Sequence, residues 1–495
     1  MFFCMALSIL LPIIAGIGLL VWNPESRQRR QRYVMTAVAA TTLLALVSMA
    51  WAWMYGADAT EGILVNFGGN LSISLRIDGA SIVFGTLVAL LWPVTTVYSF
   101  EYMKHEGEEN RFFSFFTMSF GVVLGVAFAE DFLSLYFFYE LLTLATLPLV
   151  MHSMDKKARY AGKKYLIYSL SGAALVFIGI VFLMHYGTTL NFTYGGVLDP
   201  GKIAGSESTL LAVFVLSFFG FGVKAAIFPL HGWLPDASVA PTPVSALLHA
   251  VAVVKSGVFA IMRLIYFGFG TGFLRGTFAQ YIAMAAAIVT IVYGSAKALQ
   301  IAHFKRRLAY STVSNLSYIL FGFTLMTREG MAGGLTHMVF HAIIKITLFF
   351  CAGAVMHQTE KEYVYDLEGY GKAMPITFMT FTVAAFALIG VPPLGGFVGK
   401  WSIGSAAVAS GNPMAYVGIA ALILSTLLTT LYMMTVVIRA YFPVGERALE
   451  TLDQVRDPNR SMTGPLLLLT VGGVALACCS APLLNLLRGI AAGLY

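Results

Sequence analysis

Five ionisable side chains stand inside stretches of this 495-residue sequence that are otherwise apolar enough to cross a lipid bilayer. A charged side chain at the centre of a membrane helix costs roughly 2.5 to 3.5 kcal/mol on insertion scales, so such groups are rare and mark ion or proton pathways. These positions therefore predict the movement of charge through a membrane. They are Glu140, Lys224, Lys255, Lys345 and Lys400.

Glu140 lies in the aromatic and aliphatic segment Phe137–Leu142. A carboxylate in such a segment either accepts protons or neutralises a buried cation, and we expect one of these roles. A polar contact that helps two helices to pack is the alternative.

Lys224 ends an apolar run and precedes Pro229 by five residues. Proline lacks a backbone donor and clashes with the preceding helical turn, so it predicts a helix break beside the lysine. Freed carbonyls at such a break can hold water or ions, which makes an ion site the expected feature. Extension of the lysine to the membrane surface is the alternative.

Lys255 follows His249 by six residues in the next predicted helix. Six residues span about 9 Å of helix axis, a distance that one or two water molecules can bridge. The pair is therefore compatible with a proton relay, although His249 taken alone is equally compatible with a packed polar residue.

His337, His341 and Lys345 follow one another at four-residue intervals. Residues with this spacing lie along one stripe of a helix, here a ladder about 12 Å long. Two histidines four residues apart can bind zinc, but no glutamate stands between them and no third ligand is near in the sequence. We therefore favour a proton ladder over a metal site.

Lys400 follows a second predicted break, formed by Pro392 and Pro393. The order is the reverse of that at Lys224, where the lysine precedes the break. Interrupted helices at corresponding positions of two halves are typical of inverted repeats around midplane sites. We predict three N-terminal helices, two inverted five-helix repeats, and a C-terminal loop with one last helix, at residues 1–111, 112–265, 266–440 and 441–495.

Membrane helices are needed to position these residues, and the composition supports them. Hydrophobic residues make up 58% of the chain and charged residues 11%, against roughly 25% charged residues in a soluble domain. Apolar runs of about 20 residues, the length that crosses a bilayer, recur throughout. We predict an all-α protein with fourteen membrane helices near residues 4–22, 33–56, 79–100, 112–129, 131–151, 163–185, 208–229, 243–265, 277–297, 308–326, 332–353, 375–403, 414–438 and 464–488.

Positive charge predicts the orientation, because loops rich in Lys and Arg stay on the cytoplasmic side. The loops after odd-numbered helices hold 21 such residues and the opposite loops hold 5. Both termini are therefore expected on the non-cytoplasmic side of the cell membrane. The same bias accounts for the net charge of +7, which then indicates no nucleic-acid partner. The first apolar run lacks a signal-peptide pattern, so we expect it to be retained.

The four cysteines predict no cofactor. They fall in predicted membrane helices without the paired spacing of a zinc or iron–sulfur site, and small lipid-facing or core residues are the simpler interpretation. A phosphate-binding glycine loop and a nucleophile elbow are not found either. We therefore expect no cofactor and no metal in this chain. The cysteines are Cys4, Cys351, Cys478 and Cys479.

From about Asp78 to Trp401 the sequence resembles the antiporter-like membrane subunits shared by Mrp-type cation/proton antiporters, respiratory complex I and membrane-bound hydrogenases. The segment from Leu230 to Lys255 and the histidine–lysine ladder carry the resemblance. It implies proton-translocating roles on the fifth, seventh, eighth, eleventh and twelfth helices for Glu140, Lys224, Lys255, His337, His341, Lys345 and Lys400, with His249 beside them.

In the mechanism that we favour, Glu140 and Lys224 form an ion pair whose separation promotes proton release. At roughly 4 Å and an effective dielectric constant near 20, such a pair is worth about 4 kcal/mol. The proton then passes to Lys255, along the histidines and Lys345, and leaves through Lys400.

Three features bear on which family member the chain resembles. Lys400 matches the D-type proteins of Mrp antiporters, whereas one complex I protein has glutamate at that position. Because the sequence ends soon after its last predicted helix, we expect no long lateral helix like that of the distal complex I protein. The segment His303–Arg307 lacks an acidic residue that the family often has before this basic turn, which leaves its loop contacts open.

We therefore expect a non-catalytic, proton-translocating subunit of a multisubunit membrane complex, coupled to redox chemistry or cation exchange in partner subunits. Its expected partners are the bilayer, protons and other membrane subunits, including further antiporter-like ones; sodium stays open, because lysines suit protons and repel cations. A D-type component of an Mrp Na+/H+ antiporter is the main alternative. A self-contained transporter of a small solute and a structural spacer are more remote, and the buried lysines argue against the spacer.

Overall fold

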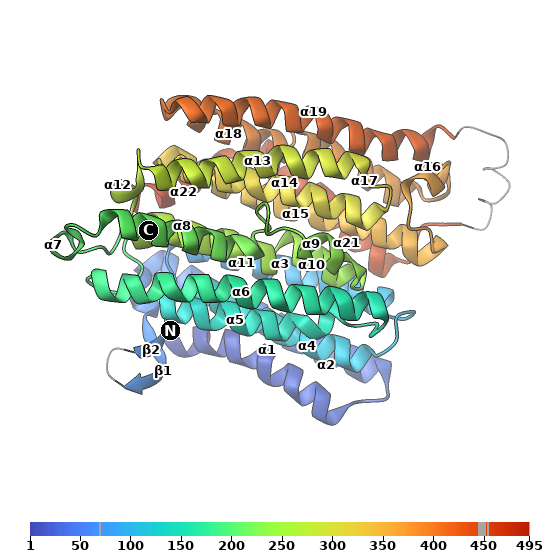
Figure 1. Ribbon diagram of the computed structural model, residues 1–495. Coiled ribbons are helices and arrows are strands. Elements are labelled where there is room, and N and C mark those ends of the chain that lie inside the picture. Colours follow the sequence, from blue (N-terminus) through green and yellow to red (C-terminus); the bar gives the residue numbers. More distant parts are fainter. Residues whose placement is uncertain (69–70, 444–451, 453–454, 495) are drawn as a thin grey trace.

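The computed structural model describes residues 1–68, 71–443, 452 and 455–494. Its long helices lie side by side along one direction and form a bundle (Figure 1). Twelve helices of the described residues are long and apolar enough to cross a membrane, which confirms an all-helical membrane architecture. Part of the predicted C-terminal loop, residues 444–451 and 453–454 and with them Arg447, lies outside the described residues.

The first three predicted membrane helices are present as α1 (Phe2–Trp22), α2 (Arg27–Tyr55) and α3 (Gly79–Tyr102). A feature that we did not predict connects α2 to α3: the short helix η1 (Ala57–Thr60) and an antiparallel hairpin of β1 (Gly62–Gly68) and β2 (Leu71–Leu75). β1 has a hydrophobic residue at every second position, and a period of two is typical of a strand. These residues are Ile63, Val65 and Phe67.

The next five predicted helices contain α4 (Glu109–Phe128), α5 (Phe132–Val150), α6 (Lys156–Tyr186), α8 (Glu207–Lys224) and the pair α10 (Thr242–Ala250) and α11 (Val253–Arg263). As predicted, α8 ends before Pro229. The span predicted at residues 243–265 is present, but its helix is interrupted, because the chain leaves the helical path at Val251 and Ala252. Both of their amides donate to the carbonyl of Leu247, so the break is local.

The second half contains α13 (Phe278–Gln300), α14 (Phe304–Thr324), α15 (Arg328–Thr359), α17 (Pro375–Ile389), α18 (Gly395–Ala409) and α19 (Pro413–Tyr441). The predicted break at Pro392 and Pro393 separates α17 from α18. The predicted last helix is divided into α21 (Arg460–Cys478) and α22 (Ala481–Ala491), and Pro482 stands in the first turn of α22, where proline is compatible with helical geometry. The inverted relation of the two halves stays a prediction.

Short elements complete the connections. They are α7 (Pro200–Ile203), α9 (Trp233–Asp236), η2 (Ala237–Val239), the π-helical turn η3 (Leu264–Phe269), α12 (Thr271–Leu274), η4 (Val364–Asp366) and α16 (Tyr370–Ala373).

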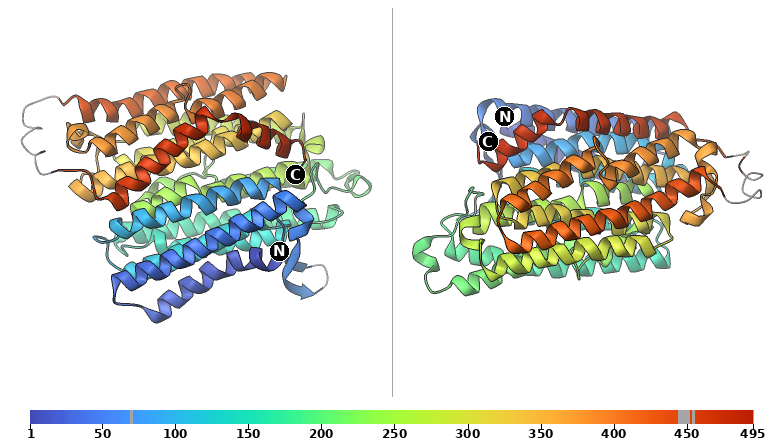
Figure 2. Two further views of the ribbon diagram at one scale, coloured as in Figure 1. Left: turned by 180° about the vertical axis from the view of Figure 1, so that it is seen from behind. Right: turned by 90° about the horizontal axis from the view of Figure 1, so that it is seen from above.

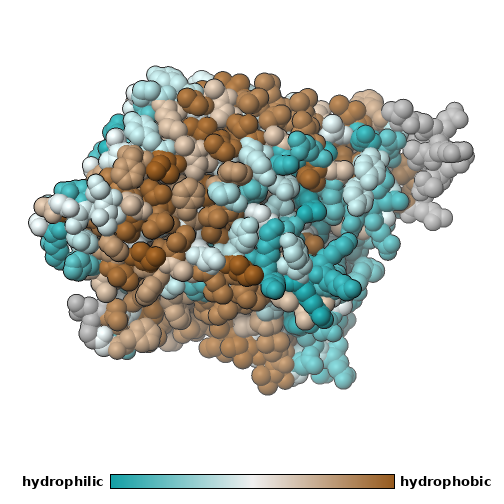
Figure 3. Space-filling view, viewed as in Figure 1, coloured by the Kyte–Doolittle hydropathy of each residue, from teal (hydrophilic) through white to brown (hydrophobic). Residues whose placement is uncertain are grey.

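The interior of the bundle is built around two helical segments. In the most apolar 18-residue stretch of each helix, 100% of the residues are buried within Thr242–Phe269 and 94% within α15. The corresponding share is 44% in both α1 and α19. The outer helices carry an apolar surface at the top and bottom of the view in Figure 3, as a lipid-facing surface requires. The lysines on α11 and α15 therefore lie at the centre of the protein.

The two chain termini lie at the same end of the bundle in all three views (Figures 1 and 2). This is what an even number of crossings produces. The side of the membrane that they face stays a prediction.

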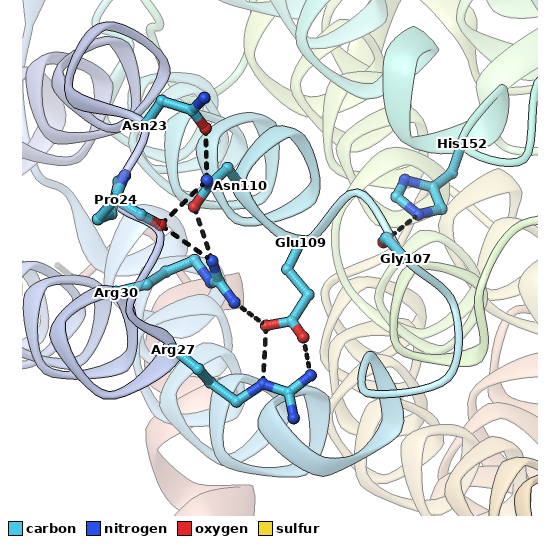
Figure 4. A network of polar contacts seen from close by, with 8 residues as sticks. All are labelled: Asn23, Pro24, Arg27, Arg30, Gly107, Glu109, Asn110 and His152. Carbon is cyan, nitrogen blue, oxygen red and sulfur yellow. Dashed lines mark hydrogen bonds and ion pairs between the residues drawn. The ribbon is translucent and has the colours of Figure 1, made fainter.

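At the opposite end, polar contacts tie the α1–α2 connection to α4 (Figure 4). Glu109 binds both Arg27 and Arg30, and Arg30 Nη1 donates to Asn110 Oδ1 at 3.0 Å. Two of the arginines that entered the charge count are thus partly neutralised by α4.

Candidate functional site

Glu140 on α5 and Lys224 at the end of α8 form the ion pair that the sequence predicted. Lys224 Nζ lies 3.6 Å from Glu140 Oε1, and the lysine side chain is 1% exposed. The ammonium also donates to the carbonyl of Tyr139 and lies 3.4 Å from the centre of the Tyr139 ring. The cation therefore has a carboxylate, a carbonyl and an aromatic face around it.

The break after α8 holds this lysine in the interior. The carbonyl of Val223 accepts a hydrogen bond from Trp233 Nε1 at 2.7 Å, so a group freed by the break is satisfied by protein. Gly257 of α11 packs against the same turn, and a Cβ there would lie 2.6 Å from the amide nitrogen of Ala225. The close approach of α11 to the break requires glycine.

Lys255 on α11 contacts α15 instead of its sequence neighbour His249. Its Nζ lies 3.1 Å from His341 Nδ1, and both side chains are fully buried. His249 stacks on Phe349 with ring centres 4.8 Å apart, and its two ring nitrogens have no hydrogen-bond partner within the part of the chain that the structure describes. The helix is interrupted between His249 and Lys255, and a water-bridged relay between the two stays a prediction.

The ladder on α15 is present, and its members turn to different partners. His337 Nε2 lies 3.2 Å from Asn315 Oδ1 on α14. The rings of His337 and His341 have centres 5.9 Å apart. Lys345 Nζ donates to Ser311 Oγ at 2.6 Å and to the carbonyl of Leu308 at 3.1 Å. The ladder is thus a stripe along one helix whose polar contacts reach α11 and α14.

Lys400 on α18 contacts the backbone at the second helix break. Its Nζ donates to the carbonyl of Ile389, the last residue of α17, at 2.8 Å, and to Thr426 Oγ1 on α19 at 3.1 Å. A cation at a helix C-terminus is stabilised by the helix dipole. Both lysines thus donate to a backbone carbonyl, that of Tyr139 on α5 for Lys224 and that of Ile389 at the break itself for Lys400.

Hydroxyl groups on α14 and α19 contact the lysines, and sequence reasoning missed them. Tyr432 Oη lies 3.0 Å from Ser311 Oγ, the partner of Lys345, and 3.2 Å from Thr429 Oγ1. Thr429 in turn donates to the carbonyl of Ser425 at 2.7 Å. Serine, threonine and tyrosine are common in membrane helices, so no sequence signal distinguished these.

A second set of hydroxyls lies one turn away, beside Lys400. Tyr318 Oη donates to Ser425 Oγ at 2.5 Å, and Lys400 Nζ lies 5.3 Å from the centre of the Tyr318 ring. Lys345 and Lys400 are therefore each in contact with a hydroxyl cluster, and the two clusters are separated by a single turn of α19.

Glu140 also borders the outer surface. Its side chain is 21% exposed and lines an apolar groove of about 560 Å³ with Leu133, Met184 and Leu190. The same three apolar residues line a polar hollow of about 380 Å³ that contains Asp131. The polar hollow at Asp131 and the apolar groove at Glu140 are therefore neighbours that share three lining residues.

The basic segment His303–Arg307, at the start of α14, has an acidic partner elsewhere in the chain. Asp236 binds Lys164 of α6 and Arg306 of α14, each at 2.7 Å. Lys305 donates to the carbonyl of Ala240 at 3.0 Å. Although an acidic residue is missing from the segment itself, the turn is anchored to the loop that follows the α8 break.

The helices that carry these side chains match a known family. Residues 129–429 match the family described as NADH:quinone oxidoreductase/Mrp antiporter, TM. The chain belongs to this family. Residues 65–113 also match the N-terminal region of NADH-ubiquinone oxidoreductase (complex I) chain 5. The predicted resemblance is therefore confirmed, and the protein is a multi-pass membrane protein.

Similar proteins include both enzyme and antiporter subunits. The NADH-quinone oxidoreductase subunit N of Desulforudis audaxviator is 33% identical over 417 residues, which cover 82% of this chain and 81% of that protein. A chain of the archaeal membrane-bound sulfane sulfur reductase superposes with a TM-score of 0.85 at 23% identity, covering 99% of this chain and 97% of the other. A chain of the Mrp complex from Dietzia sp. gives 0.83 at 22% identity over 99% and 97%. These two structures show a shared fold.

Proposed function

We propose that this protein is a proton-translocating, antiporter-like subunit of a multisubunit membrane complex. The observation that supports it best is the set of four lysines in the membrane interior, each with a protein group that can accept its proton or stabilise its charge. The partners are Glu140 for Lys224, His341 for Lys255, Ser311 for Lys345, and Thr426 with the Ile389 carbonyl for Lys400.

The ion pair is the proposed switch. At 3.6 Å the Glu140 carboxylate stabilises the protonated form of Lys224, and separation of the pair favours proton release. We expect protons to enter from the polar hollow at Asp131, which shares three lining residues with the groove at Glu140.

From Lys224 the proton moves inward to Lys255 and His341. Lys224 and Lys255 lie on elements that pack closely, since the backbone of Lys224 is within 3 Å of a Cβ built at Gly257. We expect water to bridge their side chains, because no direct contact joins them in the described residues. Two routes lead onward to Lys400: the histidines of α15 and the hydroxyl groups of α14 and α19.

The partners follow from family membership. Redox-linked relatives such as the NADH-quinone oxidoreductase subunit N favour coupling to electron transfer in a neighbouring subunit. Cation/proton exchange is the second candidate, because the family and one similar fold include Mrp proteins. A row of lysines repels sodium, so in that case the sodium path lies in a partner. We place both termini on the non-cytoplasmic side.

Proton uptake by inverted membrane vesicles that contain the assembled complex tests the proposal. Lys224→Ala and Glu140→Ala are expected to abolish most of the uptake, because each removes one half of the switch. Lys372→Ala, at an exposed lysine of α16, serves as the control. Normal uptake by both variants at normal assembly would overturn the proposal.

A further inference from the structure

A large groove opens at the end of the bundle where α15 begins and α18 ends. Its volume is about 810 Å³, and α15, α18 and α22 form its walls. This volume lies in the range of roughly 300 to 1,000 Å³ that is typical of ligand sites. None of the proposed proton-transfer residues lines it.

One part of the groove is cationic. Arg328, the first residue of α15, and Arg488 of α22 both line it, and both are exposed. Neither forms an ion pair or side-chain hydrogen bond within the part of the chain that the structure describes. Glu329 lines the groove as well, so the three side chains together carry one net positive charge. The two guanidinium groups thus face the groove without a protein acceptor.

The other part of the groove is apolar and lies deeper along the helices. Phe397 and Trp401 of α18 line it with stacked rings whose centres are 5.8 Å apart, and Trp401 is 66% exposed. The wall formed by α15 extends from Arg328 to Thr336, which is about 12 Å along the helix axis. A charged rim at the helix ends and an aromatic wall toward the membrane interior match the two parts of a lipid.

We propose that this groove binds a phospholipid with a negatively charged headgroup. The guanidinium groups of Arg328 and Arg488 hold the phosphate, since arginine matches phosphate with several donors in one plane. Ser480 and Ser405 add hydroxyl groups to the lining. The acyl chain lies against Phe397 and Trp401. A free phosphate ion would use only the rim and would leave the aromatic wall uncovered, so the geometry favours a lipid.

Fluorescence of Trp401 reports the occupant directly. The full chain is placed in nanodiscs that contain either phosphatidylglycerol or phosphatidylcholine with a doxyl quencher on the acyl chain. The signal of Trp401 is the difference between the unchanged protein and Trp401→Phe. We expect about five- to tenfold stronger quenching by the phosphatidylglycerol probe at equal mole fraction, because juxtamembrane arginines attract anionic lipid.

Three double variants distinguish the loss of positive charge in the groove from a general effect on folding. Arg328→Gln/Arg488→Gln is expected to lose the preference for phosphatidylglycerol, and Arg328→Lys/Arg488→Lys to retain most of it. Arg275→Gln/Arg456→Gln removes the same charge at exposed arginines outside the groove and should change nothing.

Other occupants give different outcomes, and each overturns the proposal. Equal quenching by the two probes means that the groove does not select a headgroup. Displacement of the phosphatidylglycerol effect by millimolar inorganic phosphate means that a free anion occupies the rim. Loss of all quenching when the chain is studied in its assembled complex means that a partner protein, or trapped water, fills the groove.

Discussion

At the scale of single residues, the four lysines differ in the group that accepts their hydrogen bond or charge. Lys224 faces a carboxylate, whereas Lys255 faces an imidazole, which in its neutral form can accept a proton from the lysine. Lys345 and Lys400 face hydroxyl and carbonyl oxygens. Only the first pair combines opposite charges, which is why we place the switch there.

Gly399 shows how closely the relay helices pack. A Cβ at this position would lie 2.6 Å from His337 Nδ1 and 2.9 Å from His337 Cα, and the next residue is Lys400. We expect Gly399→Ala to push α18 away from α15, at about 1 to 3 kcal/mol of stability as in other overpacked cores, and to slow proton uptake.

Gly404→Ala is the matched control on the same helix, because a Cβ there meets nothing within 4 Å. It should leave proton uptake unchanged and raise stability by up to about 1 kcal/mol, the helix-propensity gain of alanine over glycine. Thermal unfolding and vesicle assays measure both quantities. Equal effects of the two substitutions would contradict the packing explanation.

Glu130, in the loop between α4 and α5, predicts a pH dependence of stability. Burial, reinforced by the carboxylate of Glu61, raises the pKa of Glu130 from 4.5 to about 7. The folded state therefore binds this proton more tightly than the unfolded state, so stability falls as the pH rises from about 4.5 to about 7. The midpoint of thermal unfolding should decline over this range.

Glu130→Gln tests this assignment. The amide cannot ionise and can still accept the hydrogen bond that Asn191 Nδ2 donates at 3.1 Å. We expect a flatter profile of stability between about pH 5 and 8, with the variant a few degrees more stable than the unchanged protein at the alkaline end. A profile that keeps its original slope would assign the effect to other groups.

At the scale of elements, the outer helix α19 supplies hydroxyl groups to the proposed proton path. Less than half of its most apolar 18-residue stretch is buried. Yet Tyr432 contacts Ser311, the partner of Lys345, and Thr426 contacts Lys400 itself. The two hydroxyl clusters lie on the inward face of α19 and are one helical turn apart. We propose that protons pass between these two clusters, a route that would join Lys345 to Lys400 without the histidines.

Tyr432→Phe tests whether protons use this route. The substitution removes only the hydroxyl group, and a lost hydrogen bond of about 1 to 1.5 kcal/mol corresponds to roughly five- to tenfold in rate. We expect proton uptake to slow by this factor while assembly is unchanged. Tyr416→Phe removes a hydroxyl from an exposed tyrosine of the same helix and is the control. Full activity of Tyr432→Phe would assign the path to His337 and His341.

At the scale of the whole molecule, the bundle has two chemically different ends. Basic residues gather at the end opposite the two termini, in the connections that contain Arg27, Arg30, Lys164 and Arg306. This separation is what the positive-inside rule uses to orient a membrane protein. It predicts the cytoplasmic side without any reference to the proton path.

Thiol labelling in intact cells tests the orientation. In a variant whose four cysteines are replaced by serine, Glu61→Cys is expected to react with a membrane-impermeant maleimide, because the β1–β2 end lies with the termini. Ser153→Cys, in the connection between α5 and α6, should react only after the cells are permeabilised. The reverse pattern would show that the chain is inserted with its basic loops outside.

The sequence alone determined the features that depend on local chemistry. Apolar runs of bilayer length predict membrane helices wherever they occur, and Pro229, Pro392 and Pro393 break helices through their missing donor and ring geometry. Lysines in such runs are costly in any fold, so a functional role could be inferred for them before their interaction partners were known. The break at Val251 lacked such a signal, because no proline or glycine marks it.

Only the tertiary structure decided which groups meet. Lys255 pairs with His341, 86 residues away, and not with His249, six residues away. Lys345 reaches Ser311, and Tyr432 of α19 extends that contact. The identity of these partners depends on how α11, α14, α15 and α19 pack in space. Helix periodicity fixes the face of one helix but carries no information about the helix that lies opposite.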